Sequence, residues 1–207
     1  MKESREEIVR DILRRCGALR EGSHFLLASG LHSTKYVEKV FATGDPDVRK
    51  EFAGMIADEI GDLGIQVVVG SPMGAISLAT TLSDIMGVPL AFLEKQKDKL
   101  ALRGANVKFV EGKRVWLVED IITSGGTTDE ATDVIVAAGG EFVGVSCIFD
   151  RSTCTIKPFK PKFGAFVALA TAQLGEFPTY VPDECPQCKA GVPFDKMSGH
   201  GATKTTA

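Results

Sequence analysis

Val115-Trp116-Leu117-Val118-Glu119-Asp120-Ile121-Ile122-Thr123-Ser124-Gly125-Gly126-Thr127 is the stretch of sequence that decides the fold. Its first four residues are all apolar and do not alternate with polar residues, which is typical of a strand buried on both faces of a parallel sheet. The run ends in two adjacent carboxylates and then in a loop of hydroxyls and glycines. A buried strand has no use for such carboxylates unless their oxygens meet something outside the fold, so the stretch predicts a binding site at a strand end.

The segments on either side alternate between helix and strand patterns. Apolar residues at three- and four-residue spacing predict helices at about 5–19, 46–63 and 74–86, and Asp45-Pro46 supplies a helix start. Another helix should follow the loop, where Thr127 and Glu130 have the spacing of a capping box. Apolar runs predict strands at 65–69, 89–93, 142–149 and 163–172, and residues 21–33 are predicted to be a loop. This order indicates an α/β protein whose mostly parallel twisted sheet is flanked by helices.

Composition and charge narrow the class of partner. The 207 residues carry a formal net charge of -3, with no block of Lys or Arg that would hold a nucleic-acid backbone or a membrane surface. No apolar run approaches bilayer length, and the first residues lack the apolar core of a signal peptide. Five scattered cysteines suit a reducing compartment. We therefore expect a cytoplasmic protein that acts on a small molecule.

The loop after the carboxylates has the parts of a phosphate cradle. It combines the hydroxyls of Thr123, Ser124 and Thr127 with two glycines and the start of a helix, and backbone N–H groups at such a start bind anions. Carboxylates repel phosphate and instead suit sugar hydroxyls or hydrated Mg²⁺. The whole arrangement predicts a sugar phosphate as ligand, whereas either half alone would fit a capped helix with solvated acids.

Four segments resemble one enzyme family. Val115 to Thr127 resembles the signature of type I phosphoribosyltransferases, which bind 5-phosphoribosyl 1-pyrophosphate (PRPP). Ser29-Gly30-Leu31-His32-Ser33-Thr34-Lys35-Tyr36 and Phe149-Asp150-Arg151 resemble the Ser-Gly-x-x-Ser-x-x-Tyr and substrate-arginine segments of orotate phosphoribosyltransferases in particular. Tyr180 to Cys188 is similar to the tail of one branch of that family.

The resemblance implies transfer of phosphoribosyl from PRPP to orotate, giving orotidine 5'-monophosphate and pyrophosphate in pyrimidine biosynthesis. It also implies one structural domain overall, with an N-terminal helix and hood segment at 1–40, an α/β PRPP-binding core at 41–195 and a loose C-terminal tail at 196–207. The alternatives are a purine or uracil phosphoribosyltransferase, which differs at the base pocket, and a non-catalytic PRPP-sensing regulator. An arginine at position 151 favours a base that bears a carboxylate.

The resemblance also assigns the site residues. Lys95, Lys99 and Asp120 are expected to be catalytic, and Thr123, Arg151, Ser29 and Gly30 to bind orotate. The expected PRPP-binding residues are Glu119, Asp120, Ile121, Ile122, Thr123, Ser124, Gly125, Gly126, Thr127, Lys95, Lys99, Arg103 and Gly74. Mg²⁺ is expected to enter with PRPP and not to be held by the protein alone. The family's mobile loop closes over the neighbouring subunit's site, so a homodimer is expected.

The sequence departs from the family at three places. Ala28 and Gly74 stand where the family often has lysines, and residues 94–99 contain no histidine. Lys95 to Arg103 supply cations instead, although such a charged stretch could also be a solvated hairpin.

Cys185 and Cys188 have metal-ligand spacing, but a structural zinc needs four ligands and only one such pair is present. A surface turn is favoured over a site completed by the same pair of another subunit.

Overall fold

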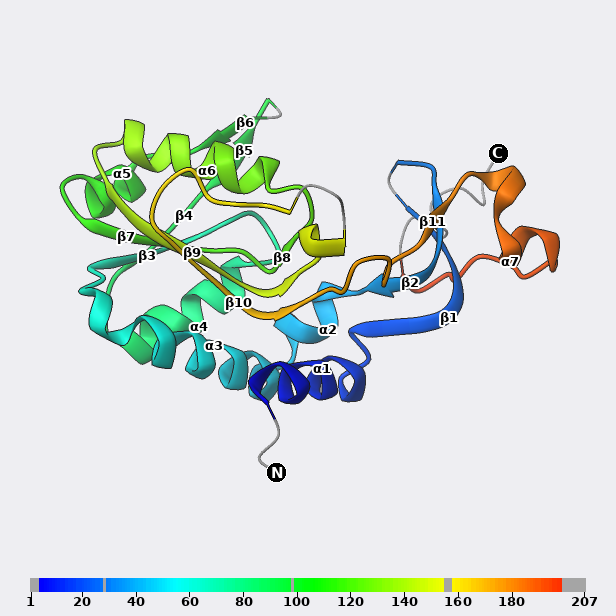
Figure 1. The fold of residues 1–207 in the computed structure, drawn as a ribbon. Helices are drawn as coiled ribbons and strands as arrows, with labels where there is room; N and C mark the ends of the chain where they lie inside the picture. Colours follow the sequence, from blue (N-terminus) through cyan, green and yellow to red (C-terminus); the bar gives the residue numbers. More distant parts are fainter. Residues whose placement is uncertain (1–3, 28, 98, 155–157, 199–207) are drawn as a thin grey trace.

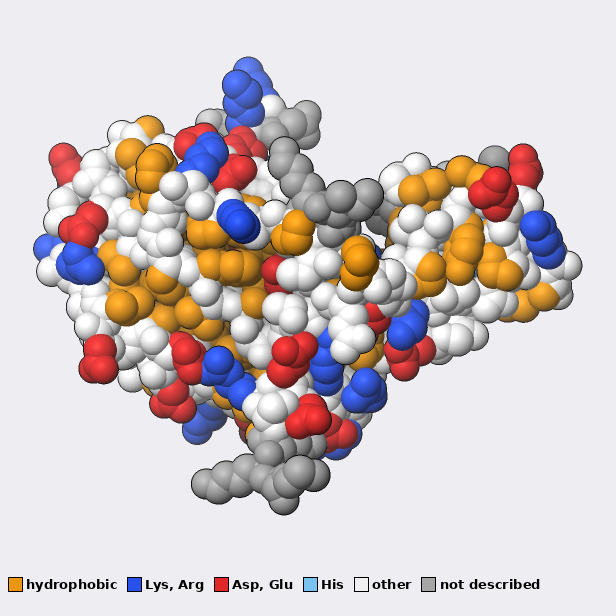
Figure 2. All heavy atoms as spheres, in the orientation of Figure 1, with side chains coloured by type: hydrophobic (Ala, Val, Ile, Leu, Met, Phe, Trp, Pro, Cys, Tyr) orange, Lys and Arg blue, Asp and Glu red, His pale blue; other side chains and the backbone are white. Residues whose placement is uncertain are grey.

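A computed structural model describes residues 4–27, 29–97, 99–154 and 158–198. Figure 1 shows a large α/β body and, beside it, a smaller antiparallel sheet near the C-terminal end. We call this smaller sheet the hood; it consists of β1 (Leu19–Leu26), β2 (His32–Val37) and β11 (Thr179–Tyr180). Figure 2 shows the body and the hood as two lobes of the surface.

The body is built on a parallel sheet, as predicted. Its strands follow the order β10-β9-β7-β3-β4, and each neighbouring pair is parallel. The short β8 pairs with the end of β9. The strand of the deciding stretch, β7, lies in the middle of this order. The bounds are β3 (Val67–Gly70), β4 (Leu90–Phe92), β7 (Arg114–Val118), β8 (Ile121–Ile122), β9 (Glu141–Asp150) and β10 (Ala165–Thr171).

Helices cover both faces of the sheet, which explains the continuous apolar runs. Trp116 and Val118 of β7 pack into one core cluster, and Val115 and Leu117 pack into another on the opposite face. Figure 1 places α1 to α4 on one side and α5 and α6 on the other. The helices are α1 (Arg5–Arg15), α2 (Lys39–Gly44), α3 (Pro46–Ile60), α4 (Ile76–Met86), α5 (Ala105–Val110), α6 (Gly126–Ala137) and α7 (Pro186–Lys189), with 3₁₀ turns η1 (Gly61–Leu63), η2 (Ser152–Cys154) and η3 (Pro182–Glu184).

The predicted loop at residues 21–33 was wrong. Most of it belongs to β1 and β2, which pair antiparallel, with a register irregularity between Glu21 and Phe25. This irregularity, together with glycine, serine and histidine in β1, hides the two-residue alternation of a strand. The third hood strand, β11, comes from the other end of the chain and pairs with β2. The hood therefore joins segments that are far apart in sequence.

The predicted capping box of α6 was also wrong. Gly125 is the N-cap, with φ +80°, and no side chain caps the helix. Glu130 instead accepts a hydrogen bond from the backbone N–H of Leu100 at 2.8 Å. Asp45 does cap α3, as predicted, because its side chain accepts hydrogen bonds from Asp47 and Val48. Residues 94–113, for which no element was predicted, contain α5 and the hairpin of β5 (Glu94–Gln96) and β6 (Lys99–Ala101).

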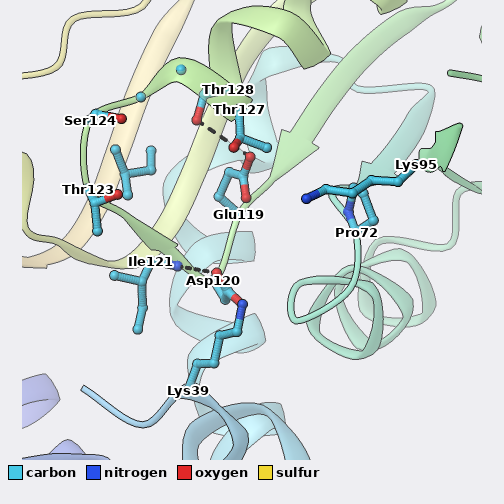
Figure 3. A pocket seen from close by; sticks show the side chains of 13 residues that line it. Lys39, Pro72, Lys95, Glu119, Asp120, Ile121, Thr123, Ser124, Thr127 and Thr128 are labelled. Atoms are coloured by element: carbon cyan, nitrogen blue, oxygen red, sulfur yellow. Dashed lines mark hydrogen bonds and ion pairs between the residues drawn. The ribbon is translucent and has the colours of Figure 1, made fainter. Parts of the chain in front are cut away.

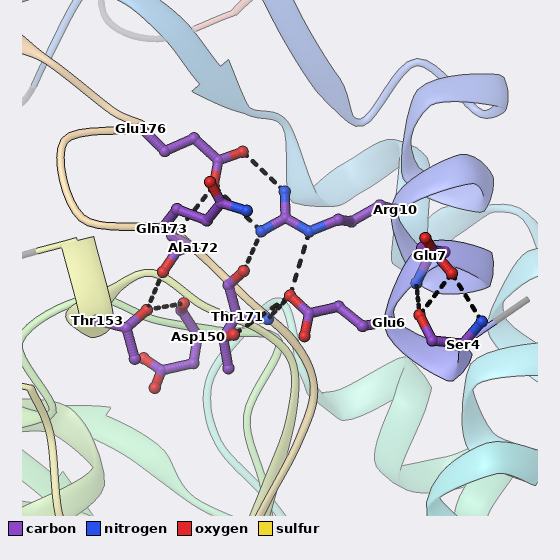
Figure 4. A network of polar contacts seen from close by, with 10 residues as sticks. All are labelled: Ser4, Glu6, Glu7, Arg10, Asp150, Thr153, Thr171, Ala172, Gln173 and Glu176. Carbon is purple, nitrogen blue, oxygen red and sulfur yellow. Dashed lines mark hydrogen bonds and ion pairs between the residues drawn. The ribbon is translucent and has the colours of Figure 1, made fainter.

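A polar network fixes α1 against the end of β10 (Figure 4). Ser4 and Glu7 form a capping box at the start of the helix. Arg10 reaches Glu176 at 2.8 Å and also contacts the carbonyl of Thr171. Both partners of this ion pair are mostly buried, so the pair is more than a solvated surface contact.

Among the residues that the structure describes, no helix has the length and apolar character needed to cross a bilayer.

Candidate functional site

A pocket of about 220 Å³ lies where β7 ends. Figure 3 shows the acids of the deciding stretch on one side of it, the hydroxyl loop around them, and Lys39 and Lys95 reaching in from other elements. The parallel strands place these side chains at the carboxyl edge of the sheet, where ligands bind in open α/β folds. The lining residues are Lys39, Pro72, Lys95, Glu119, Asp120, Ile121, Ile122, Thr123, Ser124, Gly125, Gly126, Thr127 and Thr128.

The two acids are held firmly. Glu119 and Asp120 are each only 6% exposed. The backbone N–H of Glu119 donates to the carbonyl of Ser146 at 2.8 Å, which ties the strand end to β9. Thr128 donates its hydroxyl to Glu119 at 3.5 Å, and one Asp120 oxygen accepts from the N–H of Ile121 at 2.6 Å. The carboxylates are thus positioned before any ligand arrives.

Burial has a strong effect on the protonation of Glu119. Loss of solvent raises the pKa of this carboxyl from 4.5 to about 7, and the neighbouring Asp120 charge adds to the rise. Ser71, Lys39 and Thr128 act in the opposite direction. A carboxyl that titrates near neutrality at a strand end is typical of a functional site and not of a solvated edge.

Lys39 supplies a cation that the sequence analysis missed. Its Nζ atom lies 3.1 Å from Asp120 Oδ2. The residue begins α2, directly after the hood strand β2, and it lines the pocket. The signal that could have found it was the lack of lysine at positions 28 and 74, because an acidic anion-binding site must draw its cations from elsewhere. Residue 28 lies outside the described residues.

Gly74, an expected PRPP-binding residue, lies beside the Asp120 and Lys39 side chains but is not among the residues that line the pocket. A Cβ atom at this position would stand 1.7 Å from Asp120 Oδ2 and 3.0 Å from Lys39 Cδ. Only glycine leaves room for the Lys39 and Asp120 side chains to meet here. The preceding peptide, between Pro72 and Met73, is cis.

The hydroxyl loop leads into α6 without a side-chain cap. Gly125 adopts a left-handed conformation, and a Cβ atom there would lie 1.9 Å from the ring of Phe159. The first-turn N–H groups of α6 have no capping side chain, and they lie next to the hydroxyls of Thr123, Ser124 and Thr127 in the pocket lining. An anion can satisfy such N–H groups and is favoured there by the helix dipole.

The three cations expected from the charged stretch lie in different places. Lys95, on β5, lines the pocket with the acids. Lys99, on β6, lines a separate hollow with Gln96, Lys97, Leu100 and Ala101. Arg103 pairs with Glu94 at 3.4 Å, with both side chains well exposed. Within one chain, therefore, only Lys95 of these three accompanies Glu119 and Asp120.

Arg151 lies just beyond the end of β9. Its backbone N–H donates to the carbonyl of Ile122 at 2.7 Å, and its guanidinium stands 4.6 Å from the ring centroid of Phe177. Burial lowers the pKa of this guanidinium. Its Nε atom is buried and has no hydrogen-bond partner among the described residues. A buried donor without a partner is costly, which is consistent with a ligand that would accept from it.

The other expected base-binding residues are divided between the loop and the hood. Thr123 lines the pocket with the acids. Ser29 and Gly30 lie at the turn between β1 and β2, where Gly30 has φ +82° and its N–H donates to Leu27. They are not among the residues that line the pocket around Glu119 and Asp120.

Comparison with known proteins identifies the family of the chain. The family model described as "Phosphoribosyl transferase domain" matches residues 45–176. The orotate phosphoribosyltransferase of Desulforamulus reducens is 35% identical over 201 residues, which are 97% of this chain and 100% of that protein. The orotate phosphoribosyltransferase of Caldicellulosiruptor saccharolyticus is 36% identical over 179 residues, 86% of this chain and 89% of that protein.

Solved structures share the fold at lower identity. Mycobacterium tuberculosis orotate phosphoribosyltransferase in complex with inorganic phosphate has a TM-score of 0.63 and 24% identity, covering 83% of this chain and 96% of that one. Trypanosoma brucei adenine phosphoribosyl transferase, solved with AMP, pyrophosphate and ribose-5-phosphate, has a TM-score of 0.62 and 18% identity, with 82% of each chain covered. Proteins acting on different bases match equally well in shape, so the choice of base rests on the sequence relatives and the site.

Proposed function

This chain belongs to the phosphoribosyltransferase family and, within it, to the orotate phosphoribosyltransferases. We propose that the phosphoribosyl group of PRPP is transferred to a ring nitrogen of orotate in the pocket around Glu119 and Asp120. The products are orotidine 5'-monophosphate and pyrophosphate. The observation that carries this proposal is the joining of two buried acids and an uncapped helix start in one pocket. A sugar phosphate has hydroxyls that can donate to the acids and a phosphate that can bind at the helix start.

The acids take the ribose of PRPP. Glu119 and Asp120 accept hydrogen bonds from the ribose hydroxyls, and Thr123 to Thr127 with the start of α6 hold the 5-phosphate. As the bond from the anomeric carbon to pyrophosphate stretches, the ribose gains positive charge. Carboxylates fixed nearby stabilise that charge without rearranging. No nucleophilic side chain is required, because orotate itself attacks.

The leaving pyrophosphate takes the cationic side of the pocket. Lys39 and Lys95 line this side together with Pro72, and Gly74 brings its backbone close to Asp120. Lys39 is paired with Asp120 before PRPP arrives. The incoming diol competes for the acid, so we propose that binding frees Lys39 to approach the phosphates.

Mg²⁺ would enter with PRPP. The protein offers two carboxylates here, whereas Mg²⁺ requires six oxygen ligands. Oxygens of PRPP and of water would therefore supply the remaining ligands. Once bound, the ion supplies positive charge that offsets the charge on pyrophosphate. Glu119 and Asp120 are the side chains that would contact it or its waters.

Arg151 recognises the base. Its buried Nε without a partner supports a ligand with acceptor oxygens, and the guanidinium fork suits the carboxylate of orotate better than a neutral base. Stacking on Phe177 fixes the plane of the fork. Thr123, Ser29 and Gly30 remain proposed contacts to orotate.

We also propose a homodimer in which the β5–β6 hairpin serves the partner's site. Figure 1 shows this hairpin at the edge of the body. Lys99 and Arg103 lie apart from their own acids, which supports a role in a neighbouring subunit. A cytoplasmic location likewise stays a prediction.

The test is an absorbance assay with PRPP, Mg²⁺ and a panel of bases. Orotate should be consumed only when both PRPP and Mg²⁺ are present. Turnover of uracil, hypoxanthine or guanine without turnover of orotate would overturn the choice of base. Binding of PRPP with no turnover of any base would favour a regulator.

A further inference from the structure

Two histidines of the hood and two cysteines of the C-terminal segment meet at one point. His24 lies on β1 and His32 begins β2. Cys185 is the N-cap of α7, and Cys188 lies within that helix. One ligand atom from each of the four residues lies within 4.8 Å of all the others. Figure 1 shows α7 beside the hood strands. The cluster shares no residue with the pocket around Glu119 and Asp120.

The distances fit a tetrahedron around a metal ion. Zinc bonds of about 2.0–2.1 Å to nitrogen and 2.3 Å to sulfur place the ligand atoms of a tetrahedron about 3.3–3.8 Å apart. The observed distances are 3.1 Å from His24 Nε2 to His32 Nδ1, 3.5 Å from Cys185 Sγ to His24 Nε2, 3.7 Å from Cys188 Sγ to His24 Nε2 and 3.2 Å from Cys188 Sγ to His32 Nδ1. Two of these distances fall within the tetrahedral range and two, at 3.1 and 3.2 Å, are slightly shorter, so the four ligand atoms are close to the arrangement that binds one zinc ion.

The surroundings hold the ligands in place. His24 Nδ1 lies 2.7 Å from the carbonyl of Val192, so this nitrogen donates and leaves Nε2 with its lone pair facing the cluster. Phe194 packs on both imidazoles, with ring centroids 4.1 and 4.8 Å away. His24, His32 and Cys185 are at most 5% exposed. Such a closed site has no open position for a substrate and is typical of structural zinc.

We propose that His24, His32, Cys185 and Cys188 bind one structural Zn²⁺ ion. The cysteines bind as thiolates and release their protons on binding. The ion fastens residues 182–195 to the hood, a small sheet whose third strand has only two residues. Small units with little core of their own often rely on a metal for stability. The same segment is also held to the hood by an ion pair, because the guanidinium of Arg20 on β1 lies 2.9 Å from the Asp195 carboxylate.

The first test measures metal in protein purified without a histidine tag or chelator. We expect about one zinc per chain by elemental analysis, and loss of that zinc in Cys188→Ser and His24→Gln. Cys16→Ser, a cysteine outside the cluster, should keep it. Cys188 is exposed, so its substitution should leave the body folded. Wild-type protein without metal, or equal zinc in wild type and Cys188→Ser, would overturn the proposal, as would iron in place of zinc.

Three further readouts distinguish a zinc site from a disulfide between Cys185 and Cys188. Cobalt titrated into the metal-free protein should give the visible absorption of tetrahedral Co²⁺ with thiolate ligands, and Cys188→Ser should lose it. Chelation should lower the melting temperature of wild type but not of Cys188→Ser. After chelation and unfolding without reductant, all five cysteines should react with a thiol reagent. If two fail to react because Cys185 and Cys188 have formed a disulfide, the zinc site is refuted, whatever the activity on orotate.

Discussion

The contact between Lys39 and Asp120 explains why residue 74 is glycine. A side chain at that position would occupy the space where the two groups meet. The family's frequent lysine could not stand there without displacing Lys39. In this chain the cation therefore comes from α2, on the side of the pocket next to the hood, and the segment after Pro72 contributes backbone only.

Gly74→Ala should disable the site and leave the fold intact. The new Cβ would collide with the end of the Asp120 side chain, which can rotate away, so the loss falls on ribose binding and not on packing. Removing one well-placed group from a developing charge costs about 3 kcal/mol, and we expect kcat/KM for PRPP to fall about a hundredfold. Gly54→Ala is the control, because a Cβ there meets nothing within 4 Å. Equal activity of both variants would contradict this account.

Glu119→Gln should stabilise the ligand-free protein at high pH. The folded pKa of about 7 lies above the unfolded value of 4.5, so the folded state holds its proton more tightly. The contribution of Glu119 to the unfolding free energy should be greatest below pH 4.5, decrease as pH rises to 7, and stay lower above it. The gap between the two pKa values corresponds to about 3 kcal/mol.

Denaturant unfolding at pH 5 and pH 8 checks this prediction. The gain in unfolding free energy from Glu119→Gln should be larger at pH 8 than at pH 5, whereas the exposed Glu111→Gln should show no such difference. Activity of Glu119→Gln should fall at both values. A gain that is the same at pH 5 and pH 8 would show that charge on Glu119 is not what destabilises the empty site.

Arg151→Lys should weaken orotate binding selectively. Lysine keeps the charge but loses the planar fork and the stacking on Phe177. We expect KM for orotate to rise at least about tenfold, the cost of roughly one charged hydrogen bond, with KM for PRPP nearly unchanged. Initial rates with each substrate varied in turn measure this split, and Arg15→Lys, on the exposed face of α1, is the control. An equal rise in both constants would place Arg151 outside the base pocket.

At the scale of elements, burial decided what the sequence could predict. The strands of the body are covered on both faces, so their runs are continuous and stand out, and the parallel sheet was predicted from them. The strands of the hood contain many polar residues, the pairing of β1 with β2 is irregular, and β11 has only two residues. Their pairing depends on contacts between distant segments, which no local pattern records.

The same distinction applies to the site. The acids and the hydroxyl loop at residues 123–127 are adjacent in sequence and were predicted to form one site, and both line the same pocket. Lys39 reaches the pocket only because α2 follows the hood. The meeting of His24 and His32 with the cysteines depends on the C-terminal segment folding back over β1. The sequence pattern showed only the cysteine pair as possible ligands, and the fold places the nitrogens of His24 and His32 beside that pair.

The β5–β6 hairpin should contribute to turnover through both lysines but for different reasons. Lys95 lines its own chain's pocket, whereas Lys99 does not. Lys95→Ala should lower kcat about a hundredfold, and if the hairpin also serves a partner, Lys99→Ala should lower it by a similar factor. Lys108→Ala, on the exposed part of α5, should be neutral. Unfolding should be unaffected in all three, since exposed charges contribute little to stability. Full activity of Lys99→Ala would confine the role to Lys95.

At the scale of the whole molecule, mixed dimers test whether sites are shared. One chain carries Lys99→Ala with Arg103→Ala, and the other carries Glu119→Gln with Asp120→Asn. Each should be inactive alone. After subunit exchange, half of the dimers would contain one intact site, so about a quarter of wild-type activity should return. Exchange proven by mass spectrometry without recovery would place the hairpin's action within its own subunit.

The hood takes strands from both ends of the chain, and this has a consequence for protein synthesis. The ribosome releases β1 and β2 long before β11 and the cysteines beside it, because all strands of the body lie between β2 and β11 in the sequence. The nascent chain must therefore carry an unfinished hood while the parallel sheet of the body assembles. A product that stops before Thr179 would retain every strand of the body sheet and residues 123–127, yet could not close the hood. The hood can therefore be completed only after every strand of the body sheet has been synthesised.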